Sequence, residues 1–253
     1  MSPPPPAPSL LATNPVPWTG FYVGANLGGG WTGGGNSSSC INSVTGTTSG
    51  CDIIGDGALN TSGIIGGGQF GYQMPITLGS SMPLVIGAEG DIQGTGISGS
   101  QNIAGPFNFV GFPGSSTCSP CSYTASQKIN WFSTVRARIG VPIDNFLIYG
   151  TGGLIVGGVK ASQDLAFAGG EGVVVNAKST LSGPAVGGGV EMLLPGPWSV
   201  KLEALYYDMG SLKTVATPVN GAPTNFNVFK TFGFQGAMIR LGVTLHLGDI
   251  GAL

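Results

Sequence analysis

The chain has 253 residues, a formal net charge of −2 and only 8% charged residues, against about 25% in typical soluble domains. No run of about 18 apolar residues occurs, which excludes a transmembrane helix, and the near-neutral charge argues against nucleic acid as a partner. Glycine accounts for 47 residues without a Gly-X-Y repeat. This composition favours an all-β membrane protein, and a soluble glycine-rich β-sandwich or solenoid is the alternative.

The chain opens on a proline-rich segment, residues 1–17, that has neither the basic region nor the apolar run of a signal peptide. We expect this segment to be a flexible N-terminal tail, and we interpret the sequence as a processed or altered form of an exported chain. The strand patterns occupy residues 18–247, and residues 248–253 form a short C-terminal tail.

Eight segments with strand-like alternation follow one another, at about 18–31, 60–73, 84–97, 127–139, 145–160, 176–191, 198–208 and 232–246. Long and short connections alternate between them; the long ones are 32–59, 98–126, 161–175 and 209–231, and the short ones are 74–83, 140–144 and 192–197. Five prolines fall in the short connections, namely Pro75, Pro83, Pro142, Pro195 and Pro197, whereas Pro184 falls inside the sixth segment. This arrangement predicts an eight-stranded antiparallel transmembrane β-barrel with long extracellular loops, short periplasmic turns and periplasmic termini.

Charged residues recur on one face of the predicted strands. In residues 84–93, Leu84, Ile86 and Ile92 alternate with the face that carries Glu89 and Asp91. The same separation in the other strands gives four carboxylates and four cations on polar faces: Glu89, Asp91, Glu191, Glu203, Arg136, Arg138, Lys201 and Arg240. Because outer-membrane barrels are apolar outside and polar inside, we predict that these eight side chains form an ion-pair network that packs and closes the lumen.

The four tryptophans fit the two edges of a membrane. Trp18 begins the first predicted strand and Trp31 ends it, and 13 residues tilted by about 45° span about 30 Å. Trp131 lies near the outer end of the fourth strand, and Trp198 opens the seventh. The pattern predicts an aromatic girdle at each interface; four scattered core tryptophans are the alternative.

Five of the six lysines fall at outer strand ends or loops: Lys128, Lys160, Lys178, Lys213 and Lys230. We predict that they contact lipopolysaccharide phosphates, and ordinary solvated surface charge is the alternative. The four cysteines, Cys40, Cys51, Cys118 and Cys121, form two close pairs, which favours disulfides within each pair and an oxidising compartment. A zinc site built from all four is the alternative.

Several segments together resemble a known family. Trp18-Thr-Gly-Phe-Tyr-Val-Gly-Ala-Asn-Leu-Gly-Gly-Gly-Trp31 and Gly66-Gly-Gly-Gln-Phe-Gly-Tyr72 resemble the opening strands of small alphaproteobacterial outer-membrane barrels, and residues 86–93, 134–140, 149–153, 186–191, 201–208 and 240–246 continue the match in order. Such proteins are similar to the OmpA transmembrane domain and are described as porin-like or opacity-type surface antigens. The resemblance implies eight antiparallel strands, an outer-membrane location, help from the barrel-assembly machinery and no catalytic residues. Family members usually end on an aromatic residue, whereas this chain continues to Leu253.

The predicted function is therefore that of a structural or surface-exposed barrel with a polar lumen packed by side chains. A narrow channel for small solutes is the first alternative. The second is a ligand-binding or adhesion role through loop 98–126, which contains Phe107, Phe109 and Phe112. Packing of these three side chains onto the barrel rim is the interpretation that we favour for them. We expect no catalysis, no cofactor and no metal, since the single histidine, His246, lies at a strand terminus.

Overall fold

Strands make up most of the computed structural model, which describes residues 18–42, 48–49, 57–78, 82–108, 117–166, 169–170, 172–219 and 226–248. Within these ranges the strands are β1 (Gly20–Thr32), β2 (Gly35–Asn42), β3 (Thr48–Ser49), β4 (Gly57–Ala58), β5 (Thr61–Leu78), β6 (Met82–Thr95), β7 (Ser98–Asn108), β8 (Thr117–Ile143), β9 (Phe146–Ala166), β10 (Gly172–Leu193), β11 (Trp198–Val215), β12 (Thr217–Val219) and β13 (Phe226–Gly248). None of the described segments contains a helix long and apolar enough to cross a membrane. The expected N-terminal tail, residues 1–17, lies outside the described residues; of the expected C-terminal tail, residues 248–253, only Gly248 is described, as the last residue of β13.

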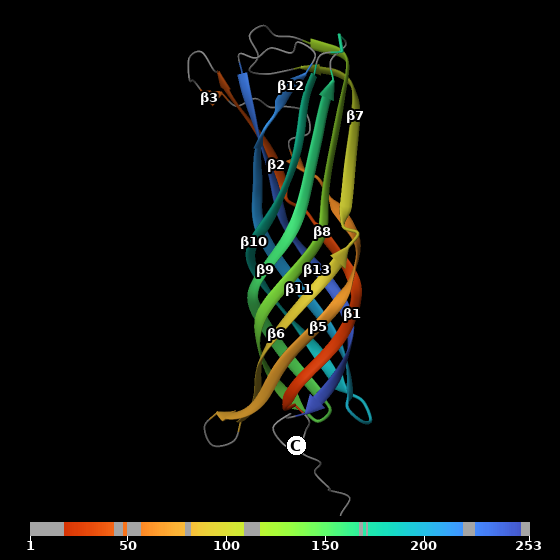
Figure 1. Ribbon diagram of the computed structural model, residues 1–253, viewed down its shortest axis with the longest axis vertical. Helices are drawn as coiled ribbons and strands as arrows, with labels where there is room; N and C mark the ends of the chain where they lie inside the picture. Colours follow the sequence, from red (N-terminus) through yellow and green to blue (C-terminus); the bar gives the residue numbers. More distant parts are fainter. Residues whose placement is uncertain are drawn as a thin grey trace, which may run out of the picture.

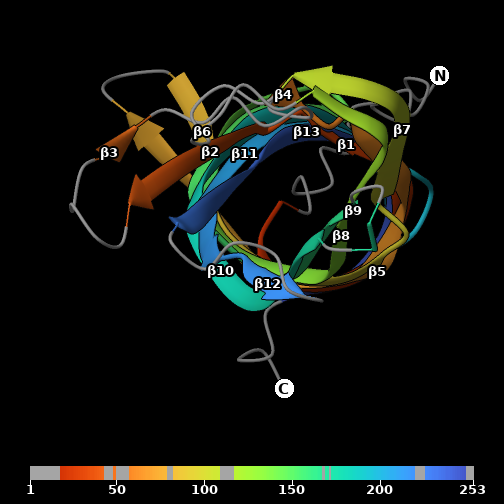
Figure 2. The ribbon, with the colours of Figure 1, turned by 90° about the horizontal axis from the view of Figure 1, so that it is seen from above.

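Eight long antiparallel strands close into a ring in the order β1–β5–β6–β8–β9–β10–β11–β13, and β13 pairs again with β1 (Figures 1 and 2). The predicted all-β class and the eight predicted strands are confirmed. Successive strands are joined at one end through residues 79–81, 144–145 and 194–197, and we call this end the turn end. The register of β1 with β13 places both ends of the barrel's chain there, at Phe21 and Gly248. The opposite end is the loop end.

Much of what the sequence predicted as long loops is strand. Strand β7 pairs with β8 from Ser98 opposite Lys128 to Asn108 opposite Thr117, so loop 98–126 is largely a β-hairpin in its described part. Strands β8 and β9 reach 27 and 21 residues, against the about 9–11 that cross a membrane. The polar composition of these segments indicated loops, but pairing with neighbouring strands determines strand formation there.

Three prolines expected in short turns lie inside strands instead, because each is paired on one side only. Pro75 of β5 lies beyond the end of β1, Pro83 of β6 lies beyond its last partner on β8, and Pro142 of β8 lies beyond its last partner on β6. Pro184 of β10 pairs with β9 but lies one residue before Ala185, the first residue of β10 that pairs with β11. A proline has no N–H to donate, so it is tolerated on the unpaired edge of a strand. Pro195 lies in a turn, as expected.

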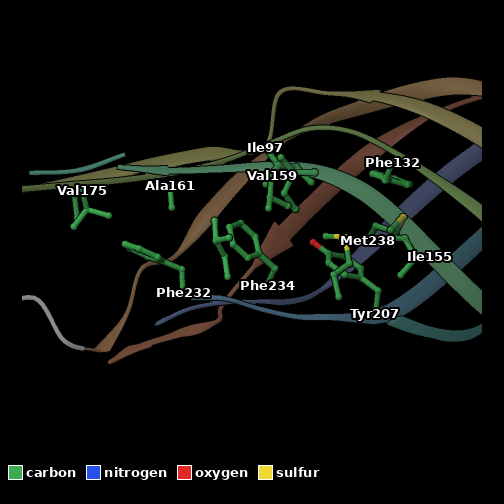
Figure 3. Packing of buried hydrophobic residues seen from close by; sticks show 14 of the residues in the cluster. Ile97, Phe132, Ile155, Val159, Ala161, Val175, Tyr207, Phe232, Phe234 and Met238 are labelled. Carbon is green, nitrogen blue, oxygen red and sulfur yellow. The ribbon is translucent and has the colours of Figure 1, made fainter. Parts of the chain in front are cut away.

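The interior changes character along the barrel axis, which corrects the prediction of a polar lumen throughout. A small apolar cluster of Trp18, Val85, Leu147 and Tyr149 lies near the turn end, and charged side chains follow it. Toward the loop end the inward-facing residues are mainly apolar, with Gln127, Gln163 and Lys230 as buried polar residues among them. Figure 3 shows Phe132, Ile155, Val159, Tyr207, Phe232, Phe234 and Met238 packed together. Outward-facing positions beside this second cluster include Lys160 and Ser162, so the barrel there has an apolar inside and a polar outside. Strands that continue beyond the membrane into water must bury their apolar faces inside.

Two register irregularities change which residues face inward. In β8 the pairing with β9 shifts between Ile129 and Trp131, so inward-facing residues are even-numbered on the turn side and odd-numbered beyond it. In β11 the pairing with β13 shifts between Asp208 and Ser211. Gly210 sits in this second irregularity with φ 81°, a conformation that favours glycine. An extra residue in a ladder reverses the facing of every residue after it.

Candidate functional site

Eight charged side chains meet inside the barrel on the turn side. They are the residues that the sequence alternation groups on polar faces, and each is at most 4% exposed: Glu89 and Asp91 on β6, Arg136 and Arg138 on β8, Glu191 on β10, Lys201 and Glu203 on β11, and Arg240 on β13. We call this set the lumen network. Because it contains as many cations as carboxylates, no net charge is buried, as the cost of burying an unpaired ion requires.

Two guanidinium groups share carboxylates at the centre of the lumen network. Arg136 Nη2 lies 2.7 Å from Glu89 Oε1 and 3.0 Å from Asp91 Oδ2. Its other terminal nitrogen, Nη1, lies 3.0 Å from Glu203 Oε1. Arg240 Nη2 lies 2.9 Å from Asp91 Oδ2, and Arg240 Nε donates to Glu203 Oε2 at 2.6 Å. Planar guanidinium groups suit such multiple contacts.

The lumen network crosses the full width of the barrel. Lys201 Nζ of β11 lies 2.7 Å from Glu89 Oε2 of β6, and these two strands are four apart in the ring of eight. Arg138 Nη2 of β8 reaches Glu191 Oε2 of β10 at 2.7 Å. Ion pairs between opposite walls fill the lumen with side chains, since an eight-stranded barrel is only wide enough for such packing.

Two tyrosines extend the lumen network, and sequence reasoning missed both. Tyr22 Oη donates to Glu89 Oε2 at 2.9 Å, and Tyr149 Oη donates to Glu203 Oε1 at 3.0 Å. The Arg138 guanidinium lies 4.1 Å from the centroid of the Tyr149 ring. Selecting charged residues alone passed over these side chains. Alternation was the available signal, because Tyr22 shares its face of β1 with Asn26, which is also buried.

Glycines make room for the two tyrosines. A Cβ atom added at Gly71 would collide with the Tyr22 hydroxyl, and one added at Gly189 would lie 2.8 Å from the Tyr149 hydroxyl. Real Cβ atoms do not approach other heavy atoms this closely. The glycines on the inner wall therefore allow the tyrosine hydroxyls to reach their carboxylates.

One combination of residue types that also occurs in hydrolases lies at the turn-end side of the lumen network. It consists of Ser199, Glu191 and His246. The Ser199 hydroxyl donates to Glu191 Oε1 at 2.6 Å and lies 3.0 Å from His246 Nε2. The same histidine nitrogen lies 3.4 Å from Glu191 Oε1. In a catalytic triad one histidine nitrogen accepts the proton of the serine hydroxyl and the other donates to a carboxylate. Here the serine and the carboxylate both face the same nitrogen, Nε2. Ser199 is also fully buried.

Three of the four tryptophans predicted as an aromatic girdle lie on the outside of the barrel: Trp31, Trp131 and Trp198. Trp18 does not, because it is 1% exposed and its ring meets His246 edge-on inside the turn end, with centroids 6.0 Å apart. Its even number places it on the same side of the chain as the inward-facing Tyr22, which explains the difference. The Trp18 prediction is therefore wrong.

Four of the five predicted outer lysines are exposed: Lys128, Lys160, Lys178 and Lys213. Lys230 is 1% exposed and faces the interior, so it cannot contact lipopolysaccharide from this position. The reason is that β13 begins at Phe226, and its alternation carries Lys230 to the same side as the inward-facing Phe232 and Arg240.

Cys121 is buried and disulfide-bonded. The side chains of Cys40, Cys51 and Cys118 lie outside the described residues, so the pairing predicted from spacing stays a prediction. Phe107, Phe109 and Phe112 also lie outside the part of the chain whose side chains are described. Within that part, no group of three or more His, Cys, Asp and Glu side chains could hold a metal ion.

The match to known proteins agrees with the closed barrel and its apolar outer belt. The family described as "Outer membrane protein beta-barrel domain" matches residues 7–235. The chain belongs to this family. It is 32% identical over 214 residues to the 31 kDa outer-membrane immunogenic protein of Brucella melitensis biotype 1, covering 83% of this chain and 79% of that protein.

A second relative is the 22 kDa outer membrane protein of Rhizobium leguminosarum bv. viciae, 35% identical over 85 residues, or 34% of this chain and 36% of that protein. Among solved structures, OprG from Pseudomonas aeruginosa is similar with a TM-score of 0.46 and 15% identity, covering 90% of this chain and 97% of that one. The protein is thus an outer-membrane β-barrel of the alphaproteobacterial kind that the sequence resembles. In such barrels the turn end faces the periplasm and the loop end faces the cell exterior.

Proposed function

We propose that this outer-membrane barrel is closed to ions and serves a structural or surface role rather than transport. The observation that carries the proposal is the lumen network, in which Lys201 and Glu89 meet across the barrel diameter at 2.7 Å. Below it, the apolar residues Trp18, Val85 and Leu147 fill the periplasmic end. Above it, Phe132 and Met238 belong to the second apolar cluster. Each of these layers removes space that a hydrated ion would need.

The surface role is supported by the long extension of the barrel beyond the membrane. Strands β8, β9 and β10 continue past the apolar belt with a packed apolar interior and so hold the loop end in a defined shape above the bilayer. The Brucella relative is named an immunogenic protein. We propose that the part of this chain between residues 98 and 126, whose described part is the β7–β8 hairpin, meets an extracellular partner at the loop end.

Planar bilayer recordings test the closed lumen. Wild-type protein should give no reproducible conductance, whereas Glu89→Ala combined with Lys201→Ala should give small ion-conducting events because the contact across the diameter is lost. Lys213→Ala, which changes an exposed lysine, is the control and should stay silent. Reproducible conductance of the wild type would overturn the proposal. A silent double variant would show that the two apolar layers close the pore even without the contact across the diameter.

A non-enzymatic role is part of the same proposal. The Ser199 hydroxyl is buried and donates to Glu191 rather than to the general base of a triad, so it should be unreactive. Folded protein treated with a fluorophosphonate probe, which labels activated serines, should carry no adduct. Labelling that disappears in Ser199→Ala would contradict this.

A further inference from the structure

Three exposed lysines lie side by side on three neighbouring strands. Lys128 of β8 is the register partner of Lys160 of β9, and Lys160 is the register partner of Lys178 of β10. Figure 1 shows these strands next to one another toward the loop end. With strands about 4.8 Å apart, the three positions form a row about 10 Å long. We call this set the lysine row.

The lysine row is unfavourable by itself, because like charges directly opposite one another across strands repel. Among the described residues, none forms an ion pair with Lys128, Lys160 or Lys178. The nearest carboxylate on the same face of β9, Asp164, lies four residues further along the strand, about 13 Å away. Three cations kept together without a counter-charge among the described residues indicate an anion supplied from outside.

The surroundings of the lysine row suit a phosphate group. The three lysines line a shallow groove of about 400 Å³ with Ser126, Ser162 and Asn176. The two serine hydroxyls are hydrogen-bonded to each other at 2.8 Å, and the asparagine amide is exposed. Lysine ammonium groups bind phosphate as point charges, and neutral hydroxyl and amide donors can complete its coordination.

The lysine row lies at the level of the outer headgroups. Trp131, an exposed tryptophan, pairs with Gly158, and its indole covers that glycine. Such tryptophans occupy the membrane–water interface. Lys160 follows Gly158 by two residues, which places it about 5 Å further outward for a strand tilted by 45°. The apolar belt of β9, from Phe146 to Gly158, spans about 28 Å by the same measure.

The irregularity in β8 is what brings Lys128 into the row. If the alternation of Arg136 and Arg138 continued unbroken, Lys128 would face the lumen, because all three have even numbers. The shift between Ile129 and Trp131 turns it outward, directly opposite Lys160. Local backbone structure therefore aligns the three charges on the outer surface.

From this geometry we propose that the lysine row binds the phosphate groups of a lipid headgroup in the outer leaflet. The ligand class is a phosphorylated glycolipid such as the lipid A part of lipopolysaccharide. The level of the row, directly above the tryptophan belt, favours a membrane-anchored phosphate over a free one. The proposal rests on the outer-membrane location of the protein and is independent of whether the lumen conducts.

The test uses the full-length protein refolded in detergent and titrated with bisphosphorylated lipid A, with bound lipid counted by native mass spectrometry. The triple variant Lys128→Gln, Lys160→Gln and Lys178→Gln should lower the affinity by about a hundredfold, or about fivefold per lysine. Lys213→Gln is the matched control, because Lys213 is equally exposed but has Thr231 as its register partner, and it should change the affinity less than twofold. A triple Lys→Arg variant should keep the binding.

Two further arms separate the sources of phosphate. Dephosphorylated lipid A should bind wild type and triple variant equally, and inorganic phosphate at millimolar concentration should not displace the lipid. Displacement by inorganic phosphate alone would overturn the assignment to a lipid, and equal affinity of wild type and triple variant would overturn the site. Heat-induced gel shift of each variant verifies folding, and the single Lys160→Gln variant, with about a fivefold loss, replaces the triple one if that does not fold.

Discussion

Replacing Arg136 by methionine tests how the lumen network stabilises the barrel. The change removes contacts to Glu89, Asp91 and Glu203 and leaves four buried carboxylates with three cations. Breaking a buried ion pair from one side costs about 3–5 kcal/mol. Each of the three carboxylates keeps a second cation, either Lys201 or Arg240, so we expect a loss near the lower limit, about 3 kcal/mol.

The double variant Arg136→Met with Glu203→Gln restores charge balance and isolates the electrostatic part. Glu203→Gln alone should also destabilise, but the double variant should be no less stable than Arg136→Met, which gives a coupling energy of about 1–3 kcal/mol. The assay is reversible urea unfolding from lipid vesicles, followed by tryptophan fluorescence, for wild type and the three variants. If the stability loss of the double variant equals the sum of the two single losses to within about 0.5 kcal/mol, the reasoning from shared carboxylates is wrong.

Two further changes test the inner wall and the outer belt. Gly71→Ala should push the Tyr22 hydroxyl away from Glu89 and cost about 1–3 kcal/mol of stability. Gly29→Ala is the control and should be neutral, because a Cβ added there meets nothing within 4 Å. The urea unfolding midpoints of the two variants are compared, and equal midpoints would contradict the packing argument. Leu154→Arg, at a 67% exposed position within the apolar belt of β9, should cost about 2–4 kcal/mol in a bilayer. Ala166→Arg, on the extension of the same strand, should change stability by less than about 0.5 kcal/mol, and the same loss at both positions would contradict the limit placed on the membrane belt.

Within the membrane belt, alternation was enough to predict which residues face the lumen. Glu89 and Asp91 share one side of β6, and Lys201 and Glu203 share one side of β11, where both pairs are buried. The prediction works there because lipid and lumen impose opposite polarity on the two faces, so a charged residue has only one favourable side. The pairing partners could not be predicted, because they depend on the closure of the ring, which places β6 opposite β11.

Two predicted placements, those of Lys230 and Trp18, were wrong. The eighth strand was predicted from residue 232, whereas β13 begins at Phe226 and carries Lys230 to the inside. Trp18 was treated as an interfacial residue by its type alone, although its numbering matches the inward-facing Tyr22. In both cases alternation from a neighbouring inward-facing residue was the missing argument. The irregularity in β11 had a recognisable sequence signal in Asp208 followed two residues later by Gly210. In the structure Asp208 accepts a hydrogen bond from Gly210 N at 2.8 Å, in the manner of an Asx turn.

The reversal of polarity between membrane and water explains why β8 and β9 have different sequence patterns. On β9 the register is unbroken, and polar residues change from odd positions such as Thr151, which face the lumen, to even positions such as Lys160, which face water. On β8 the charged residues Arg138, Arg136 and Lys128 all have even numbers, and the irregularity after Ile129 turns the strand instead. One strand thus changes its pattern and the other its geometry, and both meet the requirement that polar side chains face the lumen in the bilayer and face water above it. Deleting Asn130 should therefore remove the irregularity and join Ile129 directly to Trp131 in a regular ladder, so that Lys128 still faces outward opposite Lys160 and the register of the lumen network is unchanged.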